Sequence, residues 1–159
     1  MDKKTRPLSF SSQMVVAILA GDKTQTRRLS KPKLGIGDTF YIKETLYNEG
    51  GTIAYFADKK NIIDIIDVLP KNQNPCDWRW SADFLPSMFM PKIYARIFGE
   101  VVNLRQEQLL DINEADARAE SFEFRQDFLN YFYKRNPDHG IDGTESENPK
   151  VWVIEFVKL

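Results

Sequence analysis

The folding pattern of this chain is set by residues 19–28, which read Leu19-Ala20-Gly21-Asp22-Lys23-Thr24-Gln25-Thr26-Arg27-Arg28. Just upstream, Ser11-Ser12 offers a helix N-cap, and an apolar stripe follows at helical spacing: Met14, Val15, Ile18 and Leu19. Gly21 ends this helix, because glycine adopts the left-handed backbone conformation of a helix C-terminus without strain. Residues 23–28 then leave a Gly-Asp turn as a β-strand. We therefore expect a short helix followed at once by a strand.

The rest of the chain continues with alternating and helical patterns. Strands are expected at residues 39–47, 52–57, 92–104 and 151–156. One short helix begins after Asn113 and reaches Glu120, and a second ends before Asn136-Pro137. Residues 62–69 have helical spacing, although their β-branched side chains leave a strand open.

Two segments interrupt these patterns. Residues 48–91 are expected to form an irregular insert, which contains four prolines between positions 70 and 91. Residues 136–149 are polar and are expected to form a mobile loop. About five or six strands with two to four short helices indicate an α+β class and a single domain over residues 1–159. A closed or nearly closed mixed β-barrel is the expected arrangement, because closure removes exposed strand edges.

Composition excludes several classes of protein. The chain has 159 residues, 42% hydrophobic and 28% charged, as in ordinary globular proteins. No apolar run approaches the ~20 residues that span a bilayer, and Met1-Asp2-Lys3-Lys4 leads into no secretory segment. Cys76 is the only cysteine and forms no internal disulfide, so a cytoplasmic location without a membrane is expected. With His139 as the single histidine, neither a metal site nor histidine-dependent catalysis is expected.

Charge is distributed unevenly along the chain. Residues 1–43 contain nine lysines and arginines against three aspartates, whereas the net charge of the whole chain is -1. A basic N-terminal portion on an acidic body suits a local anionic partner. The alternative is an ordinary solvated face.

The segment Lys23-Thr24-Gln25-Thr26-Arg27-Arg28, placed directly after a helix that ends in glycine, resembles the signature of the ASCH domain family. Weaker similarities follow in the same order along the chain: Gly37-Asp38, Lys43-Glu44-Thr45 (as in phage-associated members), Pro86–Pro91, Leu110–Ala117 and Val153–Phe156. The resemblance implies a PUA-like β-barrel and a link to RNA. It implies no cofactor.

One branch of small ASCH proteins hydrolyses 4-acetylcytidine with a lysine, a threonine and a glutamate. The resemblance implies that Lys23 and Thr26 take the first two roles, and that Glu120 takes the third if the helix over residues 112–120 is aligned with theirs. Ribonuclease activity is attributed to other members. The insert at 48–91 is a departure from the small hydrolases and bears on the shape of any pocket.

The chemistry of each candidate catalytic residue has an ordinary structural alternative. Lys23 suits a base or a phosphate contact, or is a solvated turn lysine. Thr26 suits a nucleophile or a contact to a base edge, or is a plain strand residue. Strict alternation puts Lys23 and Thr26 on opposite faces, so they converge only if the strand begins after Lys23 or is bulged there. Glu120 suits a proton carrier, or is a solvated helix residue.

Candidate binding residues are spread more widely. Arg27 and Arg28 are suited to phosphate, and Thr24 is counted with them. Glu44 falls on an apolar stripe and needs a partner, for which Arg28 and Arg96 are available, or it accepts from the amine of a cytosine. Trp78 is a candidate for stacking on a base, as is Trp80, although tryptophans in loops often anchor a core.

The sequence is therefore compatible with four functions. The favoured one is a module that binds RNA or a modified nucleobase. The others are an amidohydrolase that removes an acyl group from a cytidine-like base, a ribonuclease, and a phage-related protein-interaction domain. The sequence leaves the oligomeric state open.

Overall fold

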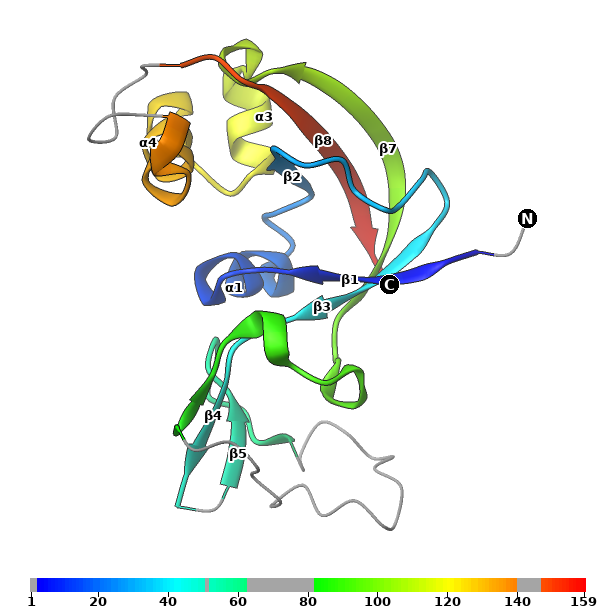
Figure 1. The fold of residues 1–159 in the computed structure, drawn as a ribbon, viewed down its shortest axis with the longest axis vertical. Coiled ribbons are helices and arrows are strands. Elements are labelled where there is room, and N and C mark those ends of the chain that lie inside the picture. Colours follow the sequence, from blue (N-terminus) through cyan, green and yellow to red (C-terminus); the bar gives the residue numbers. More distant parts are fainter. Residues whose placement is uncertain (1–2, 51, 63–81, 140–146) are drawn as a thin grey trace.

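A computed structural model describes residues 3–50, 52–62, 82–139 and 147–159 (Figure 1). Within these residues the chain forms two β-sheets and three short α-helices. The larger sheet has the order β1-β3-β7-β8-β2. Its strands are β1 (Thr5–Ser9), β2 (Gln25–Arg28), β3 (Thr39–Lys43), β7 (Phe98–Gln108) and β8 (Lys150–Lys158). β1 runs parallel to β3, and the other neighbours are antiparallel. The expected α+β class is confirmed.

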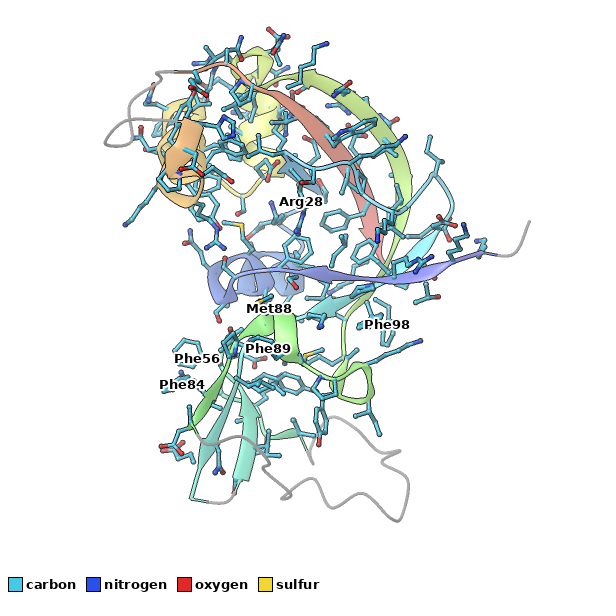
Figure 2. All side chains as sticks on the ribbon, viewed as in Figure 1. Arg28, Phe56, Phe84, Met88, Phe89 and Phe98 are labelled. Carbon is cyan, nitrogen blue, oxygen red and sulfur yellow. The ribbon has the colours of Figure 1, made fainter. Side chains whose placement is uncertain are left out.

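A smaller sheet has the order β5-β4-β6 and lies below the larger one in Figure 1. Its strands are β4 (Leu46–Glu49), β5 (Thr52–Tyr55) and β6 (Phe84–Leu85). Tyr47, Phe56 and Phe84 form an aromatic cluster here, with ring centroids 5.3–6.2 Å apart. Phe84, Met88 and Phe89 are each more than half exposed beside this sheet (Figure 2). The predicted insert therefore contains regular structure, and its residues 63–81, Trp78 and Trp80 included, lie outside the described residues.

The sheets are not closed into a barrel within the described ranges, and here the prediction is wrong. The strand expected over 39–47 is divided between the two sheets. At the break, the backbone N–H of Glu44 points to the Met90 sulfur at 3.4 Å instead of to a neighbouring strand. The chain leaves the larger sheet at this point and pairs again as β4, so β1 and β2 remain its edges.

Helix α1 (Ser12–Ala20) has the ends that the sequence predicts. The Ser11 hydroxyl accepts a hydrogen bond from the Met14 N–H, and Gly21 takes a left-handed conformation with φ 83°. Met14, Val15 and Ile18 are buried in the main core. After Gly21, the N–H of Lys23 still donates to the carbonyl of Ala17 at 3.2 Å, so this lysine is fixed at the exit of the helix.

Helices α3 (Glu114–Ala119) and α4 (Arg125–Arg135) pack together at the other end of the larger sheet (Figure 1). Asn113 caps α3 by accepting from the Asp116 N–H at 2.8 Å, as expected, and Glu120 ends this helix. Helix α4 buries four side chains in a second core: Phe128, Leu129, Phe132 and Tyr133. These two helices bring Glu120 and the inner face of α4 toward β2.

The remaining differences from the expected elements are local. Residues 92–104 are not one strand, because Lys92–Tyr94 forms the 3-10 turn η2 and β7 begins at Phe98. Three further 3-10 turns are η1 (Ser87–Phe89), η3 (Leu109–Asp111) and η4 (Pro137–His139). The last of these lies in the predicted loop at 136–149, of which residues 140–146 are outside the described ranges. In the described part of the chain, no helix has the length and apolar character needed to cross a membrane.

Candidate functional site

Lys23 and Glu120 meet where the end of α3 lies against the start of β2. The two residues form an isolated antiparallel bridge, and the next N–H, that of Thr24, donates to the carbonyl of Ala119 at 2.9 Å. The Lys23 Nζ lies 2.5 Å from the Glu120 Oε2. Their side chains are only 2% and 3% exposed, so this is a buried ion pair.

Arg27 is held by the other oxygen of the same carboxylate. Its Nη1 donates to the Glu120 Oε1 at 3.1 Å and to the Gln25 amide oxygen at 2.9 Å. Its Nη2 lies 2.8 Å from Glu107 and 3.4 Å from Asp116. With a fully buried side chain and three carboxylates around it, Arg27 serves the fold and is not free to bind a phosphate.

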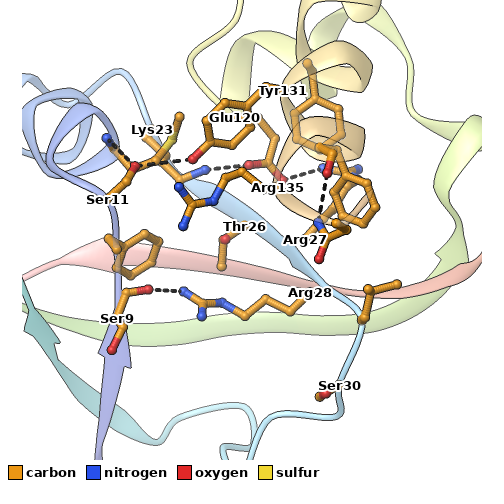
Figure 3. A pocket seen from close by; sticks show the side chains of 16 residues that line it. Ser9, Ser11, Lys23, Thr26, Arg27, Arg28, Ser30, Glu120, Tyr131 and Arg135 are labelled. Carbon is orange, nitrogen blue, oxygen red and sulfur yellow. Dashed lines mark hydrogen bonds and ion pairs between the residues drawn. The ribbon is translucent and has the colours of Figure 1, made fainter. Parts of the chain in front are cut away.

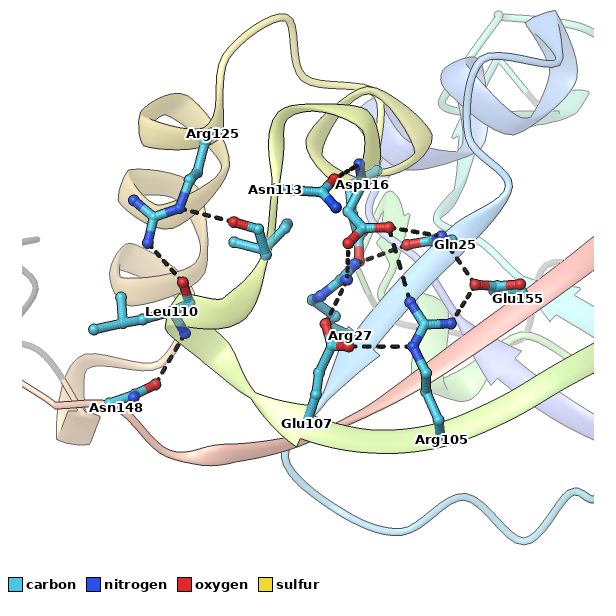
Figure 4. A network of polar contacts seen from close by, with 12 residues as sticks. Gln25, Arg27, Arg105, Glu107, Leu110, Asn113, Asp116, Arg125, Asn148 and Glu155 are labelled. Atoms are coloured by element: carbon cyan, nitrogen blue, oxygen red, sulfur yellow. Dashed lines mark hydrogen bonds and ion pairs between the residues drawn. The ribbon is translucent and has the colours of Figure 1, made fainter.

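The network extends beyond Arg27 to the surface of the sheet (Figure 4). Arg105 on β7 forms ion pairs with Glu107 and Glu155, and Gln25 donates to Asp116 at 3.2 Å and to Glu155 at 3.1 Å. These contacts join β2, α3, β7 and β8. One oxygen of the Glu120 carboxylate is therefore bound by Arg27, which this network holds in place, and the other oxygen is bound by Lys23.

A cavity of about 400 Å³ lies between α1, β2 and α4 (Figure 3). This volume falls in the range of ~300–1,000 Å³ that is usual for small-molecule sites. Polar residues on its wall include Lys23, Thr26, Arg28, Glu120, Tyr131 and Arg135. Phe10, Phe128 and Phe132 supply aromatic surface. The cavity thus combines apolar walls with a few convergent polar groups.

Thr26 lies on the cavity wall near the Lys23–Glu120 pair (Figure 3). The condition set by strand alternation is met, because β2 begins at Gln25, after Lys23. Lys23 is still in the turn from α1, so its side chain and that of Thr26 line the same cavity. The three predicted catalytic residues are therefore brought together, and their chemical roles stay predictions.

Burial lowers the pKa of the Lys23 amine from its usual value of 10.5, although the adjacent Glu120 acts in the opposite direction. The charges of Arg28 and Arg27 lower this pKa further. A lysine in this setting holds a larger share of neutral amine near neutral pH than an exposed lysine does. A neutral amine is a base, and it can take a proton from a hydroxyl group or a water molecule.

Arg28 also lines the cavity, and its contacts differ from those of Arg27. Its Nη2 donates to the carbonyl of Ser9 at 2.7 Å, and its guanidinium lies 4.9 Å from the centre of the Phe10 ring. Burial lowers the pKa of this arginine. Within the described ranges, no carboxylate forms an ion pair with it.

The other predicted binding residues lie elsewhere. Thr24 is exposed, and its backbone links Ala119 to Phe156 through hydrogen bonds of 2.9 and 3.0 Å. Glu44 and Arg96 form a bidentate ion pair with contacts of 2.8 and 2.9 Å, and Arg96 also binds Asp58 at 2.8 Å. Of the two arginines considered from the sequence, Arg96 is the partner of Glu44. Glu44 is 1% exposed, so this is a buried, structural ion pair. Trp78 lies outside the described residues.

Sequence reasoning missed two residues of α4 that face the cavity. Tyr131 and Arg135 are four positions apart, which places them on one side of the helix. The Tyr131 hydroxyl lies 3.2 Å from the Ser11 hydroxyl, and the Arg135 guanidinium lies 5.6 Å from the centre of the Tyr131 ring. The spacing was visible in the sequence, but nothing there indicated that this side of the helix faces β2.

No group of three or more histidine, cysteine, aspartate or glutamate residues is placed to hold a metal ion in the part of the chain that the structure describes. The buried carboxylates there are held by arginines and by Lys23 instead.

No protein family model and no curated protein sequence matches this chain. Among solved structures, it is similar to the crystal structure of protein EF3133 from Enterococcus faecalis V583, which carries the family model DUF984. The two are 10% identical with a TM-score of 0.49, and the match covers 100% of this chain and 82% of the other. The resemblance to ASCH domains therefore stays a prediction from the motif.

Proposed function

We propose that the cavity binds a modified pyrimidine base, of the kind found in acylated cytidine, as a nucleoside or as part of RNA. One observation carries this proposal. Lys23 and Glu120, which are 97 positions apart in the sequence, pair at 2.5 Å on the wall of a cavity that Thr26 also lines. The same three residues are those that the ASCH resemblance assigns to a cytidine-like ligand.

The size and walls of the cavity suit a flat polar ring. Phe10 and Phe128 are among the residues that give the wall of the cavity apolar surface, against which the ring of a base can pack. Thr26 and Glu120 offer hydroxyl and carboxylate oxygens to its edge, where the amine of a cytosine is a donor. A cavity of this size between α1 and α4 fits a single nucleotide better than a long stretch of duplex.

Hydrolysis of the acyl group is a second candidate, favoured by the buried amine beside a hydroxyl. In this reaction, neutral Lys23 takes the proton of a water molecule that Thr26 orients, and the water oxygen attacks the acyl carbon. The C–N bond then breaks, and the proton passes from Lys23 through Glu120 to the departing amine of the base. The products are the deacylated cytidine and a carboxylic acid, so atoms and charges balance. Ribonuclease and protein-interaction functions stay untested predictions.

Two measurements test this proposal. In the first, 4-acetylcytidine and cytidine are titrated into ¹⁵N-labelled protein, and we expect shifts of the amides of 23–28 and 128–136. In the second, the release of cytidine is followed by chromatography, and we expect turnover by the wild type and none by Lys23→Ala. Lys33→Ala is the matched control, because Lys33 is exposed and does not line the cavity. Absence of both shifts and turnover at millimolar ligand would refute the proposal. Shifts without turnover would support binding of the base and refute hydrolysis.

A further inference from the structure

Arg28 is a mostly buried cation that forms no ion pair with a carboxylate in the described part of the chain, although the charge of Glu120 acts on it. Among its five N–H donors, one contact to protein is seen, from Nη2 to the Ser9 carbonyl at 2.7 Å. Its Nε is buried and has no hydrogen-bond partner in the described part of the chain, which is also true of the Arg27 Nε, so the two arginines differ in their ion pairs. Leaving a buried guanidinium without a counter-charge is costly, so such a group calls for an explanation.

The contrast with the other buried arginines is clear. Arg27 has Glu107, Asp116 and Glu120 around it, and Arg96 is bound by Glu44 and Asp58. Arg27 and Arg96 therefore have structural roles, because each forms ion pairs with carboxylates of the same chain. Arg28 instead lies over the Phe10 ring and lines the cavity (Figure 3).

A second arginine lines the same cavity from the opposite element. Arg135 extends from the last turn of α4 over the Tyr131 ring, and it forms no ion pair with any residue in the described ranges. Burial lowers the pKa of Arg28, and although Glu120 opposes this effect, the charge of Arg135 adds to it. The two guanidinium groups therefore repel each other, and Glu120, the acidic residue on the wall of this cavity, is already bound by Lys23 and Arg27.

We propose that Arg28 and Arg135 form a subsite for a phosphate group, and that the ligand is therefore a phosphate-bearing nucleotide rather than a free nucleoside. Arginine matches phosphate oxygens with paired N–H donors, and a doubly negative group between the two arginines removes their repulsion. Ser9 and Ser11 line the same region and add hydroxyl groups that suit a phosphate.

The spacing along β2 fits this assignment. Thr26 and Arg28 are two positions apart in one strand, so their side chains leave the same face roughly 7 Å from each other. A base at Thr26 and a phosphate at Arg28 are thus separated by room for one ribose. The position of the phosphate relative to the base rests on the proposed function, whereas the subsite itself rests on the two arginines.

The phosphate has two sources, a nucleoside monophosphate or a phosphodiester within RNA. Four probes distinguish them by calorimetry on the full chain at low salt: cytidine, cytidine 5′-monophosphate, inorganic phosphate and a short oligocytidylate. We expect the monophosphate to bind about tenfold tighter than cytidine, because charge-assisted hydrogen bonds contribute that much or more. Weaker binding of the oligonucleotide than of the monophosphate identifies the monoester, and tighter binding identifies RNA.

Variants of the two arginines locate the effect. Arg28→Gln should remove most of the preference for the monophosphate, and Arg135→Gln should reduce it several-fold. Arg135 is exposed and is not part of a core, so Arg135→Gln should fold. This variant tests the phosphate subsite if Arg28→Gln does not fold. Arg6→Gln is the control, since Arg6 is exposed on β1 and does not line the cavity.

The outcomes separate the two proposals. Equal affinity for cytidine and its monophosphate, with no binding of inorganic phosphate, overturns the phosphate subsite and leaves base binding intact. A preference for the monophosphate that both arginine variants retain also overturns it. Binding of inorganic phosphate that depends on Arg28, without any binding of cytidine, supports the subsite and refutes the proposed function.

Discussion

Glu120 accepts a hydrogen bond of 2.5 Å from the Lys23 amine, and this pair closes the turn after α1 onto the end of α3. The other oxygen of the carboxylate is held by Arg27 at 3.1 Å. One buried carboxylate thus serves two cations that play different parts, because Lys23 lines the cavity wall while Arg27 ties the sheet to α3. Glu120 keeps a second partner when Lys23 is removed, whereas Lys23 has no second carboxylate partner in the described residues when Glu120 is removed.

The first prediction concerns that inequality. Glu120→Gln leaves Lys23 buried without its counter-charge, and we expect a loss of about 3–5 kcal/mol in the free energy of unfolding near neutral pH. Lys23→Met leaves Glu120 with Arg27 as a partner, and we expect a smaller loss, about 1–3 kcal/mol. Urea denaturation of both variants measures the difference. An equal loss, or a larger one for Lys23→Met, would contradict this account of the pair.

The second prediction is the pH dependence of stability. Burial lowers the pKa of Lys23 in the folded state below the usual value of 10.5. Between these two pKa values the unfolded chain binds more protons than the folded one, so the contribution of Lys23 to stability rises with pH across that window. The stability of the wild type relative to Lys23→Met should therefore increase as pH approaches 10.5, up to that value.

Thermal unfolding at a series of alkaline pH values measures this trend. Lys33→Met is the control, because Lys33 is exposed and a solvated lysine has similar surroundings in both states. A stability difference between wild type and Lys23→Met that is flat with pH would show that the amine stays charged throughout.

How much of this arrangement can be predicted from the sequence depends on how local its causes are. Ser11, Gly21 and Asn113 act on neighbouring residues, so both ends of α1 and the start of α3 are predicted correctly. The convergence of Lys23 and Thr26 is predicted conditionally, because the start of a strand decides it. The strand expected at 39–47 divides at Glu44, whose N–H contacts Met90 far along the chain, and no local pattern indicates this division.

The binding residues illustrate the same limit. Arg27 and Arg28 are adjacent, look equivalent in the sequence and both line the cavity, yet Arg27 is bound by three carboxylates while Arg28 forms no ion pair in the described part of the chain. The acidic residues that make the difference come from β7 and from the end of α3. The packing of these elements against β2 therefore determines which arginine keeps N–H donors that are not bound by carboxylates.

The third prediction concerns Glu44 and Arg96, whose bidentate pair is buried away from the cavity. Arg96→Met leaves Glu44 buried without its partner, and we expect a loss of about 3–5 kcal/mol in the free energy of unfolding. The double variant Glu44→Gln with Arg96→Met should be more stable than Arg96→Met alone. Lys3→Met is the control at the exposed pair with Glu100, where about 1 kcal/mol or less is expected.

The same variants separate a structural role for Glu44 from a role in binding. Burial raises the pKa of Glu44, and Arg96 opposes this, so loss of Arg96 raises that pKa further. We expect the folded Glu44→Gln protein to bind cytidine ligands with unchanged affinity in calorimetry. A tenfold loss of affinity in a stable Glu44→Gln protein would show that Glu44 takes part in binding.

The fourth prediction tests the hydroxyl of Thr26. Thr26→Val keeps the shape of the side chain and its suitability for β2, and it removes only the hydroxyl group. If this hydroxyl orients the attacking water, turnover of 4-acetylcytidine should fall by about a hundredfold or more, while the free energy of unfolding changes by about 1 kcal/mol or less. Thr26→Ser should retain most of the turnover, because its hydroxyl can reach the same place.

The pH profile of the remaining activity then assigns the base. Neutral Lys23 increases with pH, so kcat of the wild type and of Thr26→Ser should rise through the lowered pKa of Lys23 and level off above it. The level reached by Thr26→Val should be lower while its midpoint stays the same, since the valine leaves the amine in place. A midpoint that moves in Thr26→Val, or a Thr26→Ser protein as inactive as the valine variant, would show that Thr26 acts by shaping the cavity and not through its oxygen.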